Sequence, residues 1–248
     1  MNKHQDSPKS LNLLASFGLI FALAFALPAC SDAEEGSPSA SQIESIEPAA
    51  SSGGGITDTL PEGAIPDMSL GSDDAPITII EYASLTCSHC ADFHKDVLPD
   101  LKKNYIDTGR VKLIWRHFIL NGPDMAASAI ARCSGPDRFF PMIDMFLSRQ
   151  AEWIAPWQDI PKPGPDDTLA TMSFAADMDK FVRPAGLPAS KVEACLTDEE
   201  LQRSIMVGRQ HGASTYNITG TPTIIINGKK YEGELTFDAL NAKIRKLL

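Results

Sequence analysis

Basic residues and long apolar runs are both scarce in this sequence. Its 248 residues include 22 Lys and Arg against 32 Asp and Glu, which gives a formal net charge of -10. Phosphate binding needs a basic surface, so this charge argues against nucleic acid as a partner. The apolar run 13–27 is shorter than the about 20 residues that a membrane-spanning helix needs. No internal repeat is visible, which argues against a repeat architecture.

Cysteine is scarce too, with five residues, and only Cys87 and Cys90 have the C-x-x-C spacing. A structural zinc site usually takes two such pairs. Haem attachment needs His directly after the second cysteine, where Ala91 stands. A disulfide across so short a ring stabilises little. These absences favour redox exchange, without a metal or cofactor. A metal site of Cys87, Cys90 and His94 stays open as an alternative.

The N-terminus indicates export. Residues 1–29 begin with a positive charge and continue through the apolar run to Cys30, which predicts a signal peptide. Leu27-Pro28-Ala29-Cys30 resembles a lipoprotein signal in which Cys30 is lipidated, although Pro28 departs from the usual small residue. Ala24-Phe25-Ala26 offers an ordinary cleavage site instead, and an uncleaved anchor is the third interpretation. We expect a domain that is lipid-anchored on the periplasmic side of a bacterial membrane, or else soluble in the periplasm.

Residues 30–66 are rich in Ser, Ala, Gly, Pro and Glu, which predicts a flexible tether. Structure is then expected from Asp67 onward. Alternating β-rich and helical stretches predict a βαβ unit, a helical insertion and a closing ββα unit. The predicted segments are a strand at 77–82, a helix at about 88–104, a strand at 111–116, two antiparallel strands at 222–226 and 229–233, and a helix from Phe237. The domain boundaries are 67–121 and 213–248 for the α/β part and 122–212 for the insertion.

Two helices are predicted within the insertion from apolar spacing, and a third from a capping pattern. The spacing covers residues 139–147 and 174–182, and Thr197 to Glu200 fits a capping box. Trp153 and Trp157 fit packing positions in the insertion. The run 160–165 is rich in proline and predicts a loop.

The C-x-x-C pair falls where a strand meets a helix. Cys87 at the helix N-terminus would meet unpaired N–H groups and the positive end of the helix dipole. Both favour the thiolate, which is the reactive form, and a stabilised thiolate makes the disulfide oxidising. His89 between the cysteines adds a charge or a hydrogen bond. Cys90, one turn deeper, is expected to be the resolving thiol.

Glu81 lies six residues before Cys87, on the strand that enters the site. It is either an exposed strand carboxylate or a buried acid that exchanges protons with Cys90 through water. Pro222 opens a later strand and is either an ordinary edge-strand proline or a cis-proline. In the cis case the Thr221 carbonyl and the Pro222 ring would turn toward the sulfurs, and the exposed strand edge would bind an extended substrate.

The segment 81–94, with sequence EYASLTCSHCADFH, resembles the active-site stretch of the DsbA-like branch of the thioredoxin superfamily. The resemblance covers residues 67–248 and is carried mainly by the C-x-H-C site and the Thr221-Pro222 dipeptide. It implies an α/β thioredoxin fold (βαβ…ββα) with an inserted α-helical domain. It also implies that Glu81 is the family's buried acid and Pro222 its cis-proline. Ser88 departs from the proline common at that position, which makes strong oxidising power less secure.

Cys133 and Cys195 both fall in the insertion. Free thiols are a liability in an exported protein, so we expect a structural disulfide between them, with two buried free cysteines as the alternative. A disulfide that closes a loop of about 60 residues would stabilise the folded protein by about 3–4 kcal/mol. His94, His117 and His211 are expected to be surface or packing residues.

The function predicted from these residues is the introduction of disulfides into exported polypeptides with cysteines. The substrate thiolate would attack Cys87, and the resemblance implies reoxidation by a quinone-linked membrane partner of DsbB type. Two alternatives remain. One is a reductase or isomerase on the same fold, and the other is a metal-binding lipoprotein.

Overall fold

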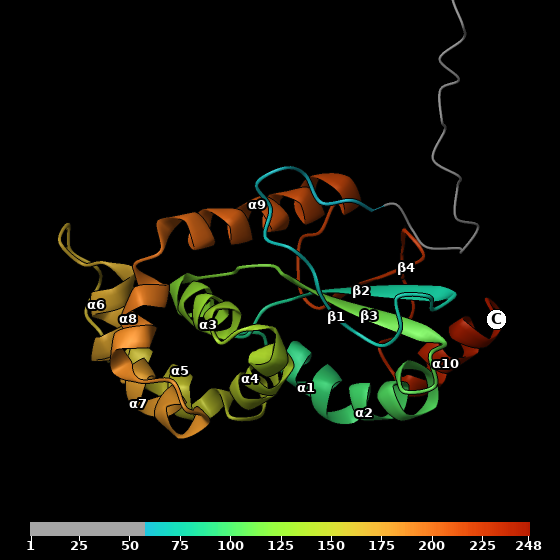
Figure 1. Ribbon diagram of the computed structural model, residues 1–248, viewed down its shortest axis with the longest axis horizontal. Helices are drawn as coiled ribbons and strands as arrows, with labels where there is room; N and C mark the ends of the chain where they lie inside the picture. Colours follow the sequence, from blue (N-terminus) through green and yellow to red (C-terminus); the bar gives the residue numbers. More distant parts are fainter. Residues whose placement is uncertain (1–57) are drawn as a thin grey trace, which may run out of the picture. The chain divides into compact units, whose positions relative to one another are not determined.

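The computed structural model describes residues 58–248, and within them one five-stranded sheet has the order β1-β3-β2-β4-β5 (Figure 1). The strands are β1 (Met68–Leu70), β2 (Ile77–Ala83), β3 (Val111–His117), β4 (Thr223–Ile226) and β5 (Lys229–Lys230). β2 and β3 are parallel, and every other neighbouring pair is antiparallel. The predicted signal peptide, 1–29, and the predicted lipidation site Cys30 lie outside the described residues.

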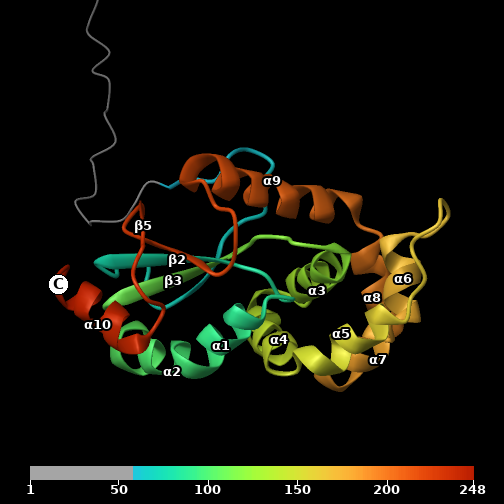
Figure 2. The same cartoon turned by 180° about the vertical axis from the view of Figure 1, so that it is seen from behind.

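Strand β2 is buried along its whole length because helices cover both of its faces. Ile77 and Ile79 pack into one core with residues of α1 (Ser88–Asp96), α2 (Leu98–Leu101) and α10 (Phe237–Arg245). Ile80 and Tyr82 belong to a second core with residues of α9 (Glu199–Tyr216). Figures 1 and 2 show α1, α2 and α10 on one side of the sheet and α9 on the other. Because side chains alternate along a strand, Glu81 shares the face of Ile77 and Ile79.

The single helix predicted over about 88–104 is divided. The chain forms α1, then α2, and then a π-helical turn at Lys102–Ile106. Pro99 lies in the first turn of α2. Proline lacks the N–H that would continue the hydrogen bonding of α1, so a new helix begins there.

The insertion is a group of helices (Figure 1), and its apolar core continues into the α/β part through Ala83, Leu85, Cys90 and Trp115. Its helices are α3 (Gly122–Cys133), α4 (Pro136–Ser148), α5 (Gln150–Gln158), α6 (Leu169–Ala175), α7 (Met178–Val182), a 3-10 turn (Arg183–Ala185) and α8 (Ala189–Leu196). The continuous helix predicted over 174–182 is wrong, because α6 ends at Ala175 and Asp177 adopts a left-handed backbone with φ of 57°. Trp153 is fully buried in this core, as predicted.

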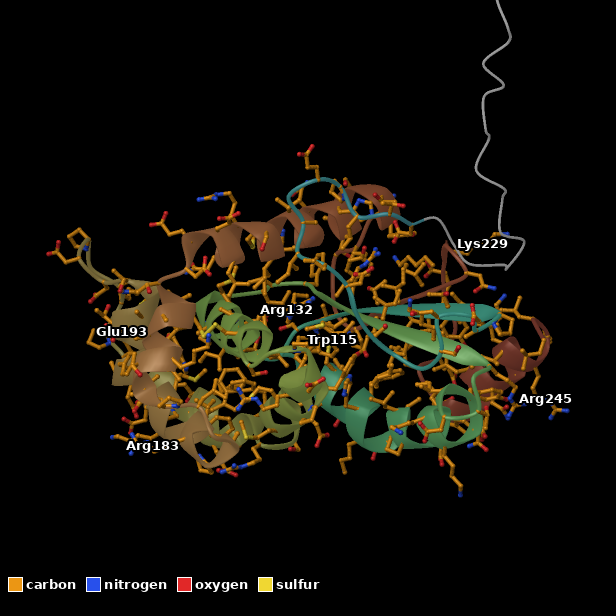
Figure 3. The ribbon with its side chains drawn as sticks, in the orientation of Figure 1. Trp115, Arg132, Arg183, Glu193, Lys229 and Arg245 are labelled. Atoms are coloured by element: carbon orange, nitrogen blue, oxygen red, sulfur yellow. A yellow bond between two sulfur atoms is a disulfide. The ribbon has the colours of Figure 1, made fainter. Side chains whose placement is uncertain are left out.

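A buried arginine joins the insertion to the sheet. Arg132 on α3 donates from Nε to His117 Nε2 at 2.9 Å, and from Nη1 to the Pro66 carbonyl at 2.7 Å. Burial holds the pKa of His117 well below its usual value, so the ring is neutral and accepts this hydrogen bond. Figure 3 shows Arg132 and Trp115, which are labelled, in the middle of the molecule where α3 meets β3.

The predicted tether, 30–66, extends too far toward the C-terminus. The side chain of Asp58 is almost fully buried; it forms an ion pair with Arg116, and its Oδ1 lies 2.8 Å from His211 Nε2. Ile65 donates its backbone N–H to the Ser204 carbonyl at 3.0 Å. Residues 58–66 are therefore held against the sheet and α9, because the buried charge of Arg116 needs carboxylate partners. Within 58–248 no helix is long and apolar enough to cross a membrane.

Helix α9 crosses the predicted boundary at residue 212, so the insertion has no separate end there. Gly212 lies directly over the Tyr82 ring, where a Cβ would collide, and this close approach lets α9 cover the sheet. The helix is capped by Asp198, whose side chain accepts from the Leu201 N–H at 2.9 Å. The predicted capping box from Thr197 is wrong, because the Thr197 hydroxyl donates back to the Glu193 carbonyl instead.

Candidate active site

The C-x-x-C pair lies at the junction of β2 and α1, as its spacing predicts. Cys87 is the N-cap residue of α1, with extended backbone angles, and it is partly exposed. Cys90 lies in the first turn and has no exposed surface. Both thiols are free. The two cysteines therefore differ in access although only two residues separate them.

The two thiols also differ in acidity. A hydrogen bond from the Cys90 thiol, helped by the backbone N–H groups of Cys90 and His89, lowers the pKa of Cys87 from 9.0 to about 5, although partial burial opposes this shift. Burial raises the pKa of Cys90 far above its usual value, and the hydrogen bond to Cys87 and the negative charge of Glu81 raise it further. At neutral pH Cys87 is a thiolate and Cys90 is a thiol.

The loop before Cys87 is held by polar side chains of the insertion. Asp124 on α3 accepts from the Leu85 N–H at 2.8 Å and from the Leu120 N–H at 3.0 Å. Gln150 on α5 donates to the carbonyls of Leu85 and Cys87 at 2.8 and 3.0 Å. Sequence reasoning missed both residues. The only local signal for Asp124 was its position after the loop that follows the predicted strand at 111–116.

Glu81 is the buried acid that one interpretation predicted. Its side chain has no exposed surface, and its Oε2 lies 3.0 Å from Nε2 of His94 on α1. His94 was expected to be a surface or packing residue, and it is instead a polar partner of Glu81. Its position one turn after Cys90 was a visible signal, because residues i and i+4 share a helix face.

The Thr221-Pro222 peptide bond is cis, as the resemblance implies. The Thr221 carbonyl oxygen lies 3.2 Å from Cys87 Sγ. Thr221 and Pro222 also line a cavity of about 590 Å³ together with Phe93, Leu235 and Phe237, and the polar residues His89, Asp92 and Asp96 line it as well. A cavity with apolar and acidic walls thus begins at the Thr221-Pro222 peptide beside the partly exposed Cys87.

His89 points to solvent beside the dithiol. Its side chain is 81% exposed, and Nδ1 lies 3.9 Å from Asp92 Oδ2. Its backbone N–H is among the groups that lower the pKa of Cys87. His89 therefore acts on Cys87 in this structure through its backbone rather than its ring.

Cys133 at the end of α3 and Cys195 on α8 form a disulfide, the pairing that the sequence predicts. Their Cα atoms are 5.8 Å apart, and 62 positions separate them in sequence. The bond lies wholly within the helices of the insertion. Among residues 58–248 no group of three or more His, Cys, Asp or Glu side chains is placed to hold a metal ion.

Comparisons with known proteins agree with this geometry. Residues 64–246 match the model of a family described as thioredoxin. A Rickettsia bellii protein, named as a candidate protein-disulfide oxidoreductase, is 27% identical over 183 residues, which are 73% of this chain and 64% of that protein. A Rickettsia felis protein of the same name is 26% identical, and the match covers 60% of it. The chain thus spans less than two thirds of the length of these Rickettsia relatives. Disulfide bond formation protein D of Bacillus subtilis is 28% identical over 72% of this chain and 76% of its own length.

Two solved structures are similar over most of their length. A protein-disulfide isomerase of Novosphingobium aromaticivorans has a TM-score of 0.68 and 27% identity, covering 74% of this chain and 98% of its own. The alpha-DsbA1 protein of Wolbachia pipientis has a TM-score of 0.62 and 27% identity, covering 76% and 92%.

The sheet, the inserted helices and the dithiol at a helix N-terminus define a dithiol protein with a thioredoxin fold and an inserted helical domain. This confirms the predicted fold class. The chain belongs to the thioredoxin family and, within it, is DsbA-like.

Proposed function

We propose that this protein is an exported thiol–disulfide oxidoreductase that introduces disulfides into polypeptides with cysteines. The observation that carries the proposal is the contrast between Cys87 and Cys90. The pKa of the partly exposed Cys87 is lowered to about 5, whereas Cys90 is buried and its pKa is raised. Attack and release at Cys87 follow from this contrast, because the accessible sulfur is also the better leaving group.

The reaction takes two exchange steps. A substrate thiolate attacks Cys87 Sγ of the Cys87–Cys90 disulfide, a mixed disulfide forms on Cys87, and Cys90 leaves with the electron pair and takes up a proton. The second substrate thiolate attacks the substrate sulfur of the mixed disulfide and releases the Cys87 thiolate. Two electrons pass from the substrate to the enzyme. A membrane thiol oxidase of DsbB type, linked to quinone, is the proposed acceptor of these electrons.

Stabilisation of the Cys87 thiolate favours the reduced enzyme, which makes the disulfide oxidising. A reductase or isomerase is the second candidate, because a structural neighbour at 27% identity is a protein-disulfide isomerase. A measured reduction potential and the redox state of the pair in cells separate these candidates. An oxidase has a high potential and an oxidised pair, whereas the alternatives have a reduced pair.

The cavity beside Cys87 is the proposed binding site for the substrate chain. Thr221 and Pro222 form its edge, and the side chains of Phe93, Leu235 and Phe237 give it apolar walls. An extended segment with an apolar residue near its cysteine fits this surface. Binding there would place the substrate sulfur next to Cys87.

Lipid attachment at Cys30, on the periplasmic side of the membrane, remains part of the proposal. It is supported by the signal sequence and by the Ser- and Gly-rich residues that follow. Labelling with a radioactive fatty acid tests it. Cys30→Ser should lose the label and leave the membrane fraction, whereas signal cleavage near Ala26 predicts no label in either form.

Oxidation of reduced ribonuclease tests the activity. Cys87→Ser should abolish disulfide transfer, because the attacked sulfur is gone, and Cys90→Ser should accumulate mixed disulfides on Cys87, because the resolving thiol is gone. Non-reducing electrophoresis detects these species. Wild-type rates from Cys87→Ser would refute the proposal.

A further inference from the structure

A buried carboxyl and a buried imidazole lie side by side behind the dithiol. Glu81 Oε2 lies 3.0 Å from His94 Nε2, and the second oxygen, Oε1, is buried without a hydrogen-bond partner. We propose that His94 is a positioning residue that acts through Glu81, and that the two together hold and replace the proton that Cys90 takes up when the Cys87–Cys90 disulfide opens. This inference rests on the proposed function and deepens it.

The pair lies in a buried, largely apolar environment built by the sheet. Glu81 is opposite Trp115 of β3 and Ile224 of β4 in the strand register. Trp115, which is 1% exposed, contacts the His94 ring edge-on with the ring centres 5.2 Å apart. A hydrogen bond between ionisable groups is strong in such surroundings, and an unpaired charge is costly. A proton is therefore better shared by the pair than held by one of its members alone.

Cys90 needs a proton donor that is buried beside it, because it has no contact with solvent. Its thiolate is disfavoured by burial and, whenever Glu81 is ionised, by the negative charge of Glu81. Cys90 nevertheless leaves as a thiolate when the disulfide is attacked. A nearby acid that protonates it in this step lowers the barrier, as general acid catalysis does.

The atoms and electrons balance as follows. The substrate thiolate bonds to Cys87 Sγ, the bond between the two sulfurs of the pair breaks, and its electrons go to Cys90 Sγ. The Glu81 carboxyl group gives its proton to Cys90 and becomes a carboxylate. His94 Nε2–H stabilises that carboxylate by donating to Oε2, and a proton that enters at Nδ1 of His94 restores the acid through the same hydrogen bond.

His94 is the member of the pair that reaches solvent. Its side chain is 5% exposed, while that of Glu81 is 0% exposed. The other titratable groups near this site are Cys90 on α1, His117 on β3 beyond Trp115, and Asp124 on α3, whose pKa responds to Cys87. Burial keeps His117 neutral, so it does not compete for the proton. Proton exchange with water thus passes through His94.

The test is the reduction of the intact, oxidised protein by glutathione in a stopped-flow instrument, with each rate constant divided by the thiolate fraction of glutathione. His94→Gln keeps an N–H donor for Glu81 but does not titrate. Lys95→Gln, the next residue on α1 and 80% exposed, is the matched control. We expect the corrected rate constant of His94→Gln to lie within about 2-fold of the wild-type value near pH 5. Near pH 8, where solvent supplies fewer protons, it should be about 10-fold lower than the wild-type value. Lys95→Gln should follow wild type throughout.

A rate ratio that is the same at every pH, including a ratio of one, would overturn the inference, because a purely structural role lowers the rate uniformly. The proposed function fails separately if wild type does not react or if the reaction does not involve Cys87.

If His94→Gln does not fold, the same reduction is measured with His94→Asn, which also carries an N–H donor and does not titrate. A rate ratio to wild type that is lower near pH 8 than near pH 5 supports the inference, and a ratio that is the same at both pH values would overturn it.

Discussion

Two cysteine pairs occupy two parts of this molecule and have opposite properties. Cys87 and Cys90 lie beside the sheet, where one is partly exposed and both are free. Cys133 and Cys195 lie in the helical insertion and form a disulfide across 62 positions. The residue type is the same in both. The surroundings make one pair reactive and the other structural.

The difference arises from the backbone and polar groups around each sulfur. Cys87 is the N-cap residue of α1, the Cys90 thiol and nearby backbone N–H groups lower its pKa, and its Sγ lies beside the Thr221 carbonyl. Cys195 is fully buried and Cys133 is only partly exposed, and their sulfurs are joined in a disulfide. The partly exposed, stabilised thiolate of Cys87 exchanges, whereas neither sulfur of the Cys133–Cys195 bond is a thiolate.

Removal of the Cys133–Cys195 disulfide should change the free energy of unfolding more than any other test of this comparison. Cys133→Ala together with Cys195→Ala should lower the free energy of unfolding by about 4 kcal/mol, because a loop of this length loses its cross-link in the unfolded state. Disulfide transfer by the folded variant should continue at nearly the wild-type rate. Chemical denaturation and ribonuclease oxidation measure the two quantities, and loss of transfer from a folded variant would contradict the division of roles.

Asp124 connects the two parts, and its removal should have the next largest effect. Asp124→Ala leaves the buried N–H groups of Leu85 and Leu120 without acceptors, so we expect a loss of about 2–4 kcal/mol in stability. Asp144→Ala, an exposed change on α4, should stay within about 0.5 kcal/mol of wild type. Equal denaturation midpoints for the two variants would show that Asp124 does not hold the loop.

The reactive pair should also make stability depend on pH in one redox state only. The pKa of Cys87 in the folded, reduced protein is about 5, below its model-peptide value of 9.0, so the thiolate stabilises the folded state. This contribution to the free energy of unfolding is fully present above about pH 9. It decreases as the pH falls from 9 to 5, and it is absent below about pH 5. Thermal unfolding should therefore show a melting temperature difference, reduced minus oxidised, that increases over this range. A constant difference would indicate an ordinary Cys87 thiol.

Helix caps in the two parts should have the smallest effects and leave exchange unchanged. Thr236 caps α10 beside the sheet, and Thr168 caps α6 in the insertion. Replacement of either by Ala should cost about 1 kcal/mol, because one N–H loses its acceptor. Denaturation curves measure the loss. A change in transfer rate for Thr168→Ala alone would show that the insertion is coupled to the site more tightly than proposed.

The sequence sufficed for features encoded by local pattern. The apolar runs of β2 and β3 and the C-x-x-C pair before a helix each predict structure within a few residues. Cys133 and Cys195 were paired because both fall in the insertion and free thiols are a liability in an exported protein.

Features that depend on distant contacts were missed. Asp58 lies next to a Ser- and Gly-rich stretch, and its place is fixed by Arg116 and His211, which are both distant from it in sequence. The short strand β1 has three residues and forms because β3 offers it a free edge. His94 was visible on the helix face of Cys90, but its function depends on Glu81, which reaches it from another element.

The central claim is that the surroundings of Cys87 make it the reactive thiol, and its titration tests this most directly. The reduced protein is alkylated briefly with iodoacetamide at a series of pH values, and mass spectrometry measures the modified fraction of each cysteine. We predict that Cys87 reacts with a midpoint near pH 5 while Cys90 stays unmodified throughout the range. A Cys87 midpoint near 9, the value of an ordinary cysteine here, or reaction of Cys90 at lower pH than Cys87, would contradict the account.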